Sequence, residues 1–357
     1  MTPHVLIIRF SAIGDVAMAV PIVVSAARKY PHVRFTVLSR PFARPLFEDI
    51  EPNLFFMGAD VKTEYKGIHG LNKLYRRLMA KQFTAVADLH DVLRTKYLRW
   101  RFNFSFTDLC RVAHIDKHRS EKRHLCARKN KVKRQLPTSF QNYSDVFAKI
   151  GYPVDIDFNS IFSLGGADLT ALPKSIFPYS DSKAIKPEGQ KWIGIAPFAA
   201  HQWKIYPVGS MEEVIRLVIK AHPDCRIFFF GGGKGEMLQF NQWCSKYPQC
   251  TNASAQLGGL ANELKLMSHL DVMLSMDSGN MHLAAIAGCP VISVWGATHP
   301  FAGFAPWKQS PDDVVHADLP CRPCSAYGNK KCYRGDFACM RIITPEMIVA
   351  TLNHHLA

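Results

Sequence analysis

The sequence lacks any apolar stretch long enough to cross a membrane as a helix. Its longest apolar stretch, Val16–Ala27, has 12 residues and contains Pro21, whereas a spanning helix needs about 20 residues. The N-terminal residues also lack the basic region that begins a secretory signal peptide. We therefore expect a cytoplasmic protein.

The glycine-rich fingerprint of dinucleotide-binding proteins is missing as well. Val5–Phe10 is typical of a central strand, and the loop that follows, Ser11–Asp15, contains one glycine, Gly14. The fingerprint G-x-G-x-x-G needs three. A dehydrogenase is therefore poorly supported.

Acidic residues are scarce relative to basic ones. The chain of 357 residues has 44 Lys and Arg against 29 Asp and Glu, a formal net charge of +15. Apolar residues make up 48% and charged residues 20%, which indicates a packed protein rather than a disordered one. The excess positive charge predicts an acidic partner: nucleic acid, an anionic membrane face or a phosphorylated substrate.

The strongest charge feature, Lys117–Arg134, contains no aromatic residue. Nine Lys and Arg side chains are opposed there by Glu121 alone. Proteins that bind nucleic acid combine basic residues with aromatic ones that stack on bases, so this pattern weakens the nucleic-acid interpretation. A solvated face or loop remains one interpretation, and capture of a polyanionic substrate is the other.

The ten cysteines do not have the density of a small disulfide-linked scaffold. They are spread from Cys110 to Cys339, which favours reduced thiols or a metal site. Four of them lie within 19 residues in the C-terminal part. Four thiolates are typical of structural zinc, and reduced or disulfide-linked thiols are the alternative for this set: Cys321, Cys324, Cys332 and Cys339.

Short β-branched runs alternate with helical patterns along both halves of the chain. This alternation predicts an α/β protein with doubly wound parallel sheets, and the length favours two domains. The expected strands are Val5–Phe10, Arg34–Ser39, Leu54–Met57 and Ala85–Leu89, then Trp192–Ala196, Arg226–Phe230, Val272–Met276 and Val291–Trp295.

The stretch Val272–Pro300 reads as strand, tight loop, helix and strand. Its loop, Asp277–Gly279, lies where a helix begins at the carboxyl end of a strand. Free N–H groups and the helix dipole favour an anion there, and small residues let a phosphate approach the backbone. In the alternative interpretation, Asp277 merely caps the helix.

Three further loops follow expected strands. Asp15 follows the first strand and is either a site residue or a helix cap. Lys204 precedes the expected helix Val208–Ala221, where it could bind a diphosphate or remain solvated. Gly231–Gly233 forms a turn after the strand Arg226–Phe230, where the lack of side chains lets another group come close to the backbone.

Four motifs in this order resemble glycosyltransferase family nine, the heptosyltransferases of lipopolysaccharide core synthesis. They are S-A-I-G-D at Ser11–Asp15, the Lys204 loop, the triple glycine, and D-S-G-x-x-H-L-A-A-x-x-G-x-P at Asp277–Pro290. The resemblance implies a GT-B fold, in which two Rossmann-like domains face each other across a cleft. It also implies an inverting transfer from ADP-heptose, held by the C-terminal domain, to an acceptor received by the N-terminal domain.

Carried over by position, the resemblance assigns roles to individual residues. Asp15 resembles the catalytic base, Lys204 a ligand of the donor phosphates and Asp277 the residue that holds the sugar. The remaining expected donor-site residues are Ser278, Gly279, His282, Gly231 and Gly232, and the expected acceptor-binding residues are Lys122, Arg123, Arg128 and Lys131.

The residue types agree with that chemistry. A carboxylate can accept the proton of an attacking sugar hydroxyl, and a lysine with helix N–H groups can stabilise the departing diphosphate without a metal. We therefore expect no catalytic cofactor. A lipid A–Kdo acceptor would make the protein a peripheral enzyme on the inner face of the inner membrane, with positive charge as the attraction.

The expected organisation is an acceptor-binding domain at residues 1–164, an interdomain segment at 165–190 and a donor-binding domain at 191–343. The donor-binding domain includes a cysteine-rich loop at residues 320–340, and a closing helix occupies residues 344–357. The alternatives are a family member with another nucleotide-sugar donor, and a non-catalytic protein that binds nucleotide sugars or polyanions. Nucleic-acid binding ranks behind both.

Overall fold

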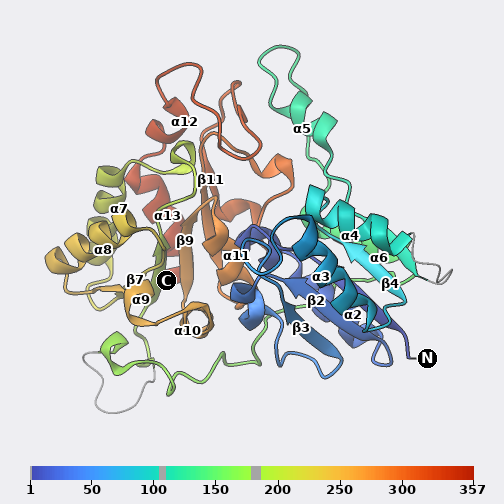
Figure 1. Ribbon diagram of the computed structural model, residues 1–357. Helices are drawn as coiled ribbons and strands as arrows, with labels where there is room; N and C mark the ends of the chain where they lie inside the picture. Colours follow the sequence, from blue (N-terminus) through green and yellow to red (C-terminus); the bar gives the residue numbers. More distant parts are fainter. Residues whose placement is uncertain (1, 104–109, 178–185) are drawn as a thin grey trace. The chain divides into compact units, whose positions relative to one another are not determined.

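The computed structural model describes residues 2–103, 110–177 and 186–357 of the chain (Figure 1). Its contacts divide the chain into two compact units. The first unit comprises Met1–Lys117 and Pro137–Ile161, and the second comprises His118–Leu136 and Phe162–Ala357.

The first unit is built on a five-stranded parallel sheet with the order β3-β2-β1-β4-β5. Its central strand β1 is buried along its whole length, as its continuous run of apolar residues predicts. The strands are β1 (His4–Ile8), β2 (Arg34–Ser39), β3 (Leu54–Gly58), β4 (Ala85–Asp88) and β5 (Arg111–His114).

The helices of the first unit follow these strands. The helix expected after the first strand is two helices, and Pro21 lies in the first turn of the second one, where proline fits. The helices are α1 (Ile13–Ala17), α2 (Val20–Lys29), η1 (Pro41–Leu46), α3 (Gly67–Met79), α4 (Leu93–Asn103) and α6 (Ser139–Lys149).

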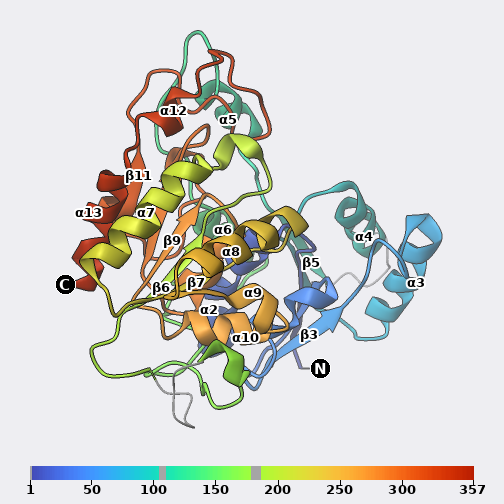
Figure 2. The ribbon, with the colours of Figure 1, turned by 90° about the vertical axis from the view of Figure 1, so that its left-hand side faces the viewer.

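The second unit has a six-stranded parallel sheet with the order β11-β10-β9-β6-β7-β8. Its central strands are fully buried, and the C-terminal helix α13 contacts α7 (Figure 2). The strands are β6 (Trp192–Ala196), β7 (Arg226–Phe229), β8 (Cys250–Asn252), β9 (Val272–Met276), β10 (Val291–Trp295) and β11 (Val314–His316).

Helices of the second unit connect its strands. The longer ones are α7 (Val208–Ala221), α8 (Lys234–Lys246), α10 (Leu260–Met267), α11 (Gly279–Ile286) and α13 (Pro345–Leu356). The shorter ones are α5 (Arg119–Leu125), η2 (Lys174–Ile176), η3 (Gln202–Lys204), α9 (Ala253–Gln256), η4 (Pro300–Ala302), η5 (Pro311–Asp313) and α12 (Ala338–Arg341).

Both sheets are doubly wound, so each has a point at which the strand order reverses. In the first sheet that point lies between β1 and β4, and in the second it lies between β6 and β9. Ligands of open α/β sheets bind at the carboxyl ends of such strands. We therefore expect ligand-binding residues in the loops that follow β1, β4, β6 and β9.

The basic segment, which we define as His118–Leu136, belongs to the second unit rather than to the N-terminal domain in which we expect it. Its buried residues Leu125 and Leu136 form a small apolar cluster with Ala302. The Leu136 amide also donates to the Phe301 carbonyl at 2.9 Å. Figure 2 shows α5 beside the C-terminal loops of the same unit.

The described part of the expected interdomain segment packs on the second unit as well. The imidazole of His269 is 2.6 Å from the Ala167 carbonyl oxygen, and Lys186 forms an ion pair with Asp271 at 2.7 Å. Residues 178–185 of that segment lie outside the described residues. Among the residues that the structure does describe, no helix combines the length and apolarity needed to cross a membrane.

Candidate functional site

Asp15 lies in the first turn of α1, directly beyond the carboxyl end of β1. Its Oδ2 atom accepts a hydrogen bond from the Ala12 backbone N–H at 3.0 Å and lies 2.7 Å from the guanidinium of Arg9. Tyr143 of α6 donates to the Asp15 carbonyl at 3.2 Å. The carboxylate is thus held in position while 29% of its side chain stays accessible.

Arg9 pairs with the candidate base Asp15, and the sequence expectations do not include it. Burial alone would lower the pKa of its guanidinium, but Tyr143 and Asp15 raise it, so the group stays charged. It also donates to the Leu89 carbonyl in the loop after β4. The detectable signal was a cation inside the otherwise apolar run Val5–Phe10. Its guanidinium holds the Asp15 carboxylate in place through the ion pair at 2.7 Å.

His90 lies in the loop after β4 and faces the loop after β1. Its Nδ1 accepts from the Phe10 amide at 3.4 Å, which directs its Nε2 proton toward the Ser11 hydroxyl at 3.5 Å. Burial, with Arg9 and Lys117 adding to it, lowers the pKa of His90 to about 3. The imidazole is therefore neutral near pH 7, so Arg9 rather than His90 supplies the positive charge beside Asp15.

The second unit brings Lys204 and Asp277 together. Lys204 ends η3 after β6, Asp277 follows β9, and these two strands are neighbours in the sheet. The Lys204 ammonium lies 3.1 Å from the Asp277 carboxylate, with 13% and 10% of the two side chains exposed. The pair therefore presents a partly buried cation at the switch point of the second sheet.

The N-terminus of α11 adjoins this pair. Ser278 occupies the N-cap position, but its side chain makes no capping hydrogen bond within the described structure. The amides of the first turn, which begins at Gly279, therefore keep their capacity to bind an anion. Asn280 contacts the Phe230 carbonyl at 3.5 Å, and His282 is buried on the same helix.

Gly231 and Gly232 lie at the end of β7, but their amides already have protein acceptors. The Gly231 amide donates to Ser254 at 3.0 Å and the Gly232 amide to Glu236 at 2.8 Å. A Cβ at position 231 would lie 2.4 Å from a carboxylate oxygen of Glu236 and 2.9 Å from Phe240. Close packing on α8 therefore explains Gly231, and the two glycines contribute a turn rather than free donors.

The cysteine-rich loop is anchored by a second residue that the sequence reasoning missed, Arg322, which is 1% exposed. Burial lowers the pKa of its guanidinium to about 10, so it is charged near pH 7. Its partners are the carbonyl oxygens of Gly296, Trp295, Thr298 and Ala317 and the Nδ1 atom of His316. A single buried cation thus ties the loop to the carboxyl end of β10.

The four cysteines of this loop are free thiols in the structure. In the described ranges, no group of three or more His, Cys, Asp or Glu side chains is arranged to hold a metal ion. Burial raises the pKa of the Cys324 thiol, and it raises that of Cys339 to about 12. Structural zinc at Cys321, Cys324, Cys332 and Cys339 stays a prediction.

The expected acceptor-binding cations divide into two groups. Lys122, Arg123 and Arg128 line a pocket between the basic segment and the cysteine-rich loop. Lys131 does not line it. Its ammonium donates to the carbonyl oxygens of Leu125, Cys321 and Pro323 at 3.3, 3.1 and 2.5 Å. These bonds use the three N–H groups of Lys131, which acts as an anchor of the basic segment.

Comparison with known proteins gives matches of sequence and of fold. A relative from Campylobacter jejuni, described as lipooligosaccharide heptosyltransferase 2, is 26% identical over 168 residues, 45% of this chain. The match spans 50% of that relative's length. Lipopolysaccharide core heptosyltransferase OpsX of Haemophilus influenzae is 24% identical over 312 residues, 87% of this chain and 83% of the relative.

A solved structure shares the fold of both units. The structure of E. coli ADP-heptose lps heptosyltransferase II superimposes with a TM-score of 0.68 and 17% sequence identity, covering 99% of this chain and 98% of the other. The two Rossmann-like units are thus those of a GT-B fold. The model of glycosyltransferase family 9 (heptosyltransferase) matches residues 71–333, and this match shows that the chain belongs to that family.

Proposed function

We propose that the chain is an inverting glycosyltransferase that moves heptose from ADP-heptose to an anionic saccharide of the lipopolysaccharide inner core. The observation that carries the proposal is the Lys204–Asp277 pair beside the uncapped N-terminus of α11. A cation and a row of backbone N–H groups at one sheet edge suit a diphosphate, the leaving group of a nucleotide sugar.

One set of residues would activate the acceptor hydroxyl, and another would stabilise the leaving diphosphate. Asp15, oriented by its ion pair with Arg9, would accept the proton of the attacking acceptor hydroxyl as the new glycosidic bond forms. The negative charge that develops on the departing diphosphate would be stabilised by Lys204 and by the first amides of α11. Asp277 would hold a sugar hydroxyl through its carboxylate. Attack from the face opposite the leaving group inverts the anomeric carbon.

The net charge of +15 supports action at an anionic membrane face, where we propose that the lipid-linked acceptor is met. Clustered Lys and Arg side chains gain binding energy near anionic lipid, and the gain falls with salt. Salt-sensitive co-sedimentation with phosphatidylglycerol vesicles tests this part of the proposal.

The decisive experiment incubates the purified chain with ADP-heptose and Kdo-lipid A and compares it with the Asp15→Asn variant. We expect a heptosylated product, and we expect Asp15→Asn to lower kcat by about 10²–10⁴ because the general base is lost. Binding of ADP-heptose should stay within about twofold, since the change lies in the first unit and Lys204 in the second.

Asp155→Asn is the matched control, because Asp155 is an exposed aspartate of the first unit that pairs only with Lys29 in the described contacts. It should leave kcat unchanged. Tight binding of nucleotide sugar with no transfer to any acceptor would support a non-catalytic binding protein. Transfer from a different nucleotide sugar, but not from ADP-heptose, would show that heptose is not the donated group. An unchanged kcat in Asp15→Asn would remove Asp15 from the mechanism.

A further inference from the structure

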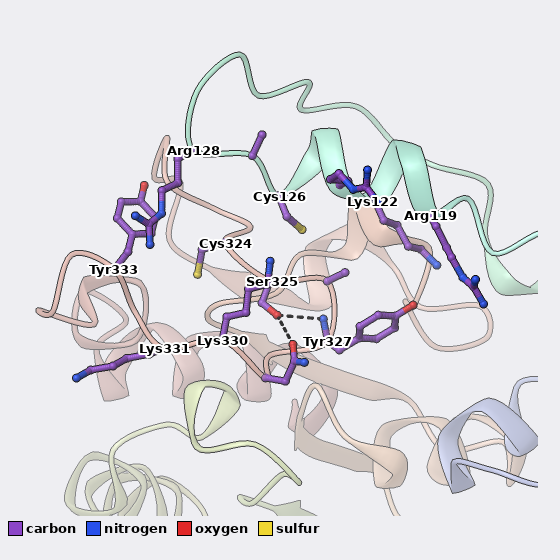
Figure 3. Close-up of a pocket in the computed structure, with 14 residues that line it drawn as sticks. Arg119, Lys122, Cys126, Arg128, Cys324, Ser325, Tyr327, Lys330, Lys331 and Tyr333 are labelled. Atoms are coloured by element: carbon purple, nitrogen blue, oxygen red, sulfur yellow. Dashed lines mark hydrogen bonds between the residues drawn. The ribbon is translucent and has the colours of Figure 1, made fainter. Parts of the chain in front are cut away.

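A pocket of about 600 Å³ lies within the second unit, between α5 with its following loop and the cysteine-rich loop (Figure 3). Six of its lining residues are cationic, and none is Asp or Glu. They come from two segments separated by about 200 positions in the sequence: Arg119, Lys122, Arg123 and Arg128, and then Lys330 and Lys331.

Contacts between the two walls hold the pocket in shape. Lys131 donates to the Cys321 and Pro323 carbonyls, and Lys133 forms an ion pair with Asp318 at 2.6 Å. The Arg128 guanidinium lies 4.6 Å from the centre of the Tyr333 ring. Lys131 and Lys133 do not line the pocket, so the contacts that join its two walls are separate from most of its lining cations, which the fold brings together.

Six cations line one pocket whose lining contains no Asp or Glu, so positive charge predominates on its walls. Bringing like charges together is unfavourable unless a ligand or counter-ion of opposite sign is present. An anion with several charged groups would contact both walls at once. Arginine binds phosphate and carboxylate through two parallel hydrogen bonds, which favours those groups over a diffuse negative charge.

Two tyrosines give the pocket a second chemical feature. Tyr327 is 50% exposed and Tyr333 is 41% exposed, and both line it. Arg128 lies over one face of the Tyr333 ring, and the exposed surface that remains on both rings is where the C–H face of a sugar ring can stack while the cations bind its substituents. The volume is within the range of small-ligand sites, so it suits one or two sugar rings rather than an extended polymer.

The wall that carries these tyrosines also reaches the donor-site lysine. Gly328 has φ +76°, and a Cβ there would lie 2.3 Å from the Cδ atom of Lys204. The Gly328 amide donates to the Ser325 hydroxyl at 3.0 Å, and the Cys324 amide to the Ala297 carbonyl at 3.0 Å. One short loop therefore lines the pocket and packs against the side chain of Lys204.

We propose that this pocket binds a compact saccharide bearing two or more phosphate or carboxylate groups, and that this saccharide is the anionic part of the acceptor. The identification as acceptor rests on the proposed function, whereas the binding chemistry follows from the pocket alone. The second unit, and not only the first, would then take part in acceptor recognition.

The test measures binding of a soluble probe, the fully deacylated Kdo-lipid A saccharide, which carries phosphates and carboxylates but no acyl chain. The double variant Arg128→Gln/Lys330→Gln removes one cation from each wall. We expect it to weaken binding by roughly five- to thirtyfold, as expected for two partly exposed ion pairs. Raising the salt concentration should shrink the difference.

The matched control is Lys129→Gln/Arg134→Gln, which removes the same two residue types from the basic segment at positions that do not line the pocket. Its affinity should stay within about twofold of the original. Equal weakening in both double variants would overturn the proposal, because diffuse charge would then explain binding. Circular dichroism and the melting temperature verify that both variants are folded.

Additional experiments identify the class of anion that binds and distinguish the proposed pocket from the proposed function. Phosphatidylglycerol vesicles or a single-stranded oligonucleotide that bind through Arg128 and Lys330, while the saccharide does not, would overturn the proposed ligand class. Probe binding with the expected difference, but no heptose transfer, would refute the proposed function and leave the pocket standing. Heptose transfer with equal probe affinity in the unmodified chain and in Arg128→Gln/Lys330→Gln would refute the pocket and support the proposed function.

Occupancy of the pocket can also be measured by the protection of its cysteines, without an activity assay. Cys126 and Cys324 both line the pocket, whereas Cys110 lies in the first unit. A bound saccharide should slow alkylation of Cys126 and Cys324 by about threefold or more relative to Cys110, measured by peptide mass spectrometry at pH 8. Equal rates at the three thiols, with and without saccharide at saturation, would contradict the assignment.

Discussion

The ammonium group of Lys204 carries the clearest prediction at the scale of one residue. Its partner Asp277 lies 3.1 Å away, and the first turn of α11 begins two residues beyond that aspartate. Lys204→Gln removes a charge-assisted bond to phosphate, so we expect ADP-heptose affinity to fall by about 10- to 150-fold. Isothermal titration calorimetry measures this change directly.

Lys220→Gln provides the control for that measurement, because Lys220 is an exposed lysine at the end of α7 in the same unit. Its affinity for ADP-heptose should equal that of the unmodified chain. If Lys204→Gln bound the donor equally well, the diphosphate would have to lie elsewhere, and the assignment of the α11 N-terminus would fail with it.

The positions of candidate site residues in the fold were predictable from the sequence where a local pattern carries them, whereas their roles stay predictions. Asp277 follows its strand directly and Asp15 lies at the start of the helix after its strand, and both strand-to-helix connections are readable from a few consecutive residues. Arg9 and Arg322 were missed, because their roles depend on partners that the fold supplies. The sequence predicts Lys131 as an acceptor ligand because its charge is visible there, whereas the carbonyl groups that it binds are not.

At the scale of elements, the cysteine-rich loop depends on one buried guanidinium. Arg322→Leu would leave four carbonyl groups and the His316 imidazole without their cationic donor. We expect the free energy of unfolding to fall by about 3–5 kcal/mol, the cost of breaking a buried charged network. Urea denaturation measures the loss.

Arg334→Gln tests whether this cost is specific to the buried position. Arg334 lies in the same loop, and its ion pair with Asp336 is 40% and 44% exposed. Its removal should change the free energy of unfolding far less than Arg322→Leu does, because water and salt screen an exposed ion pair. A similar loss of stability in the two variants would mean that Arg322 is not the anchor of the loop.

Most strands agree with the sequence expectations to within two residues, because buried parallel strands are continuous apolar runs. The sequence shows α5 only as a basic run, because charged residues dominate this short helix, which has one buried residue, Leu125. The docking of the basic segment on the cysteine-rich loop joins positions about 190 apart, such as Lys131 and Cys321. A local pattern contains no signal for such a contact.

At the scale of the whole molecule, buried histidines link stability to pH. Burial lowers the pKa of His4 to about 4, and that of His90 and His299 to about 3, from the ordinary 6.5. The unfolded chain therefore binds more protons than the folded one below about pH 6.5, and stability falls as the pH drops. We expect each histidine to cost up to about 2 kcal/mol at pH 5.

Chemical denaturation at pH 7.5, 6 and 5 measures this dependence. His4→Gln should flatten the loss of stability between pH 7.5 and 5, whatever its effect at pH 7.5, because one buried site no longer titrates. His69→Gln is the matched control, the same exchange at an exposed position on α3. A pH dependence unchanged in His4→Gln would show that His4 does not contribute to it.

The contact between Gly328 and Lys204 has a consequence for the order in which ligands bind. A saccharide that restrains the Gly328 loop would alter the freedom of the lysine that holds the diphosphate, and so change donor affinity. Linkage requires the effect to be reciprocal, with each ligand changing the other's dissociation constant by the same factor. Titrating the probe in the presence and absence of ADP gives two dissociation constants for the probe, and their ratio measures the coupling. A ratio of one would mean that the two sites fill independently.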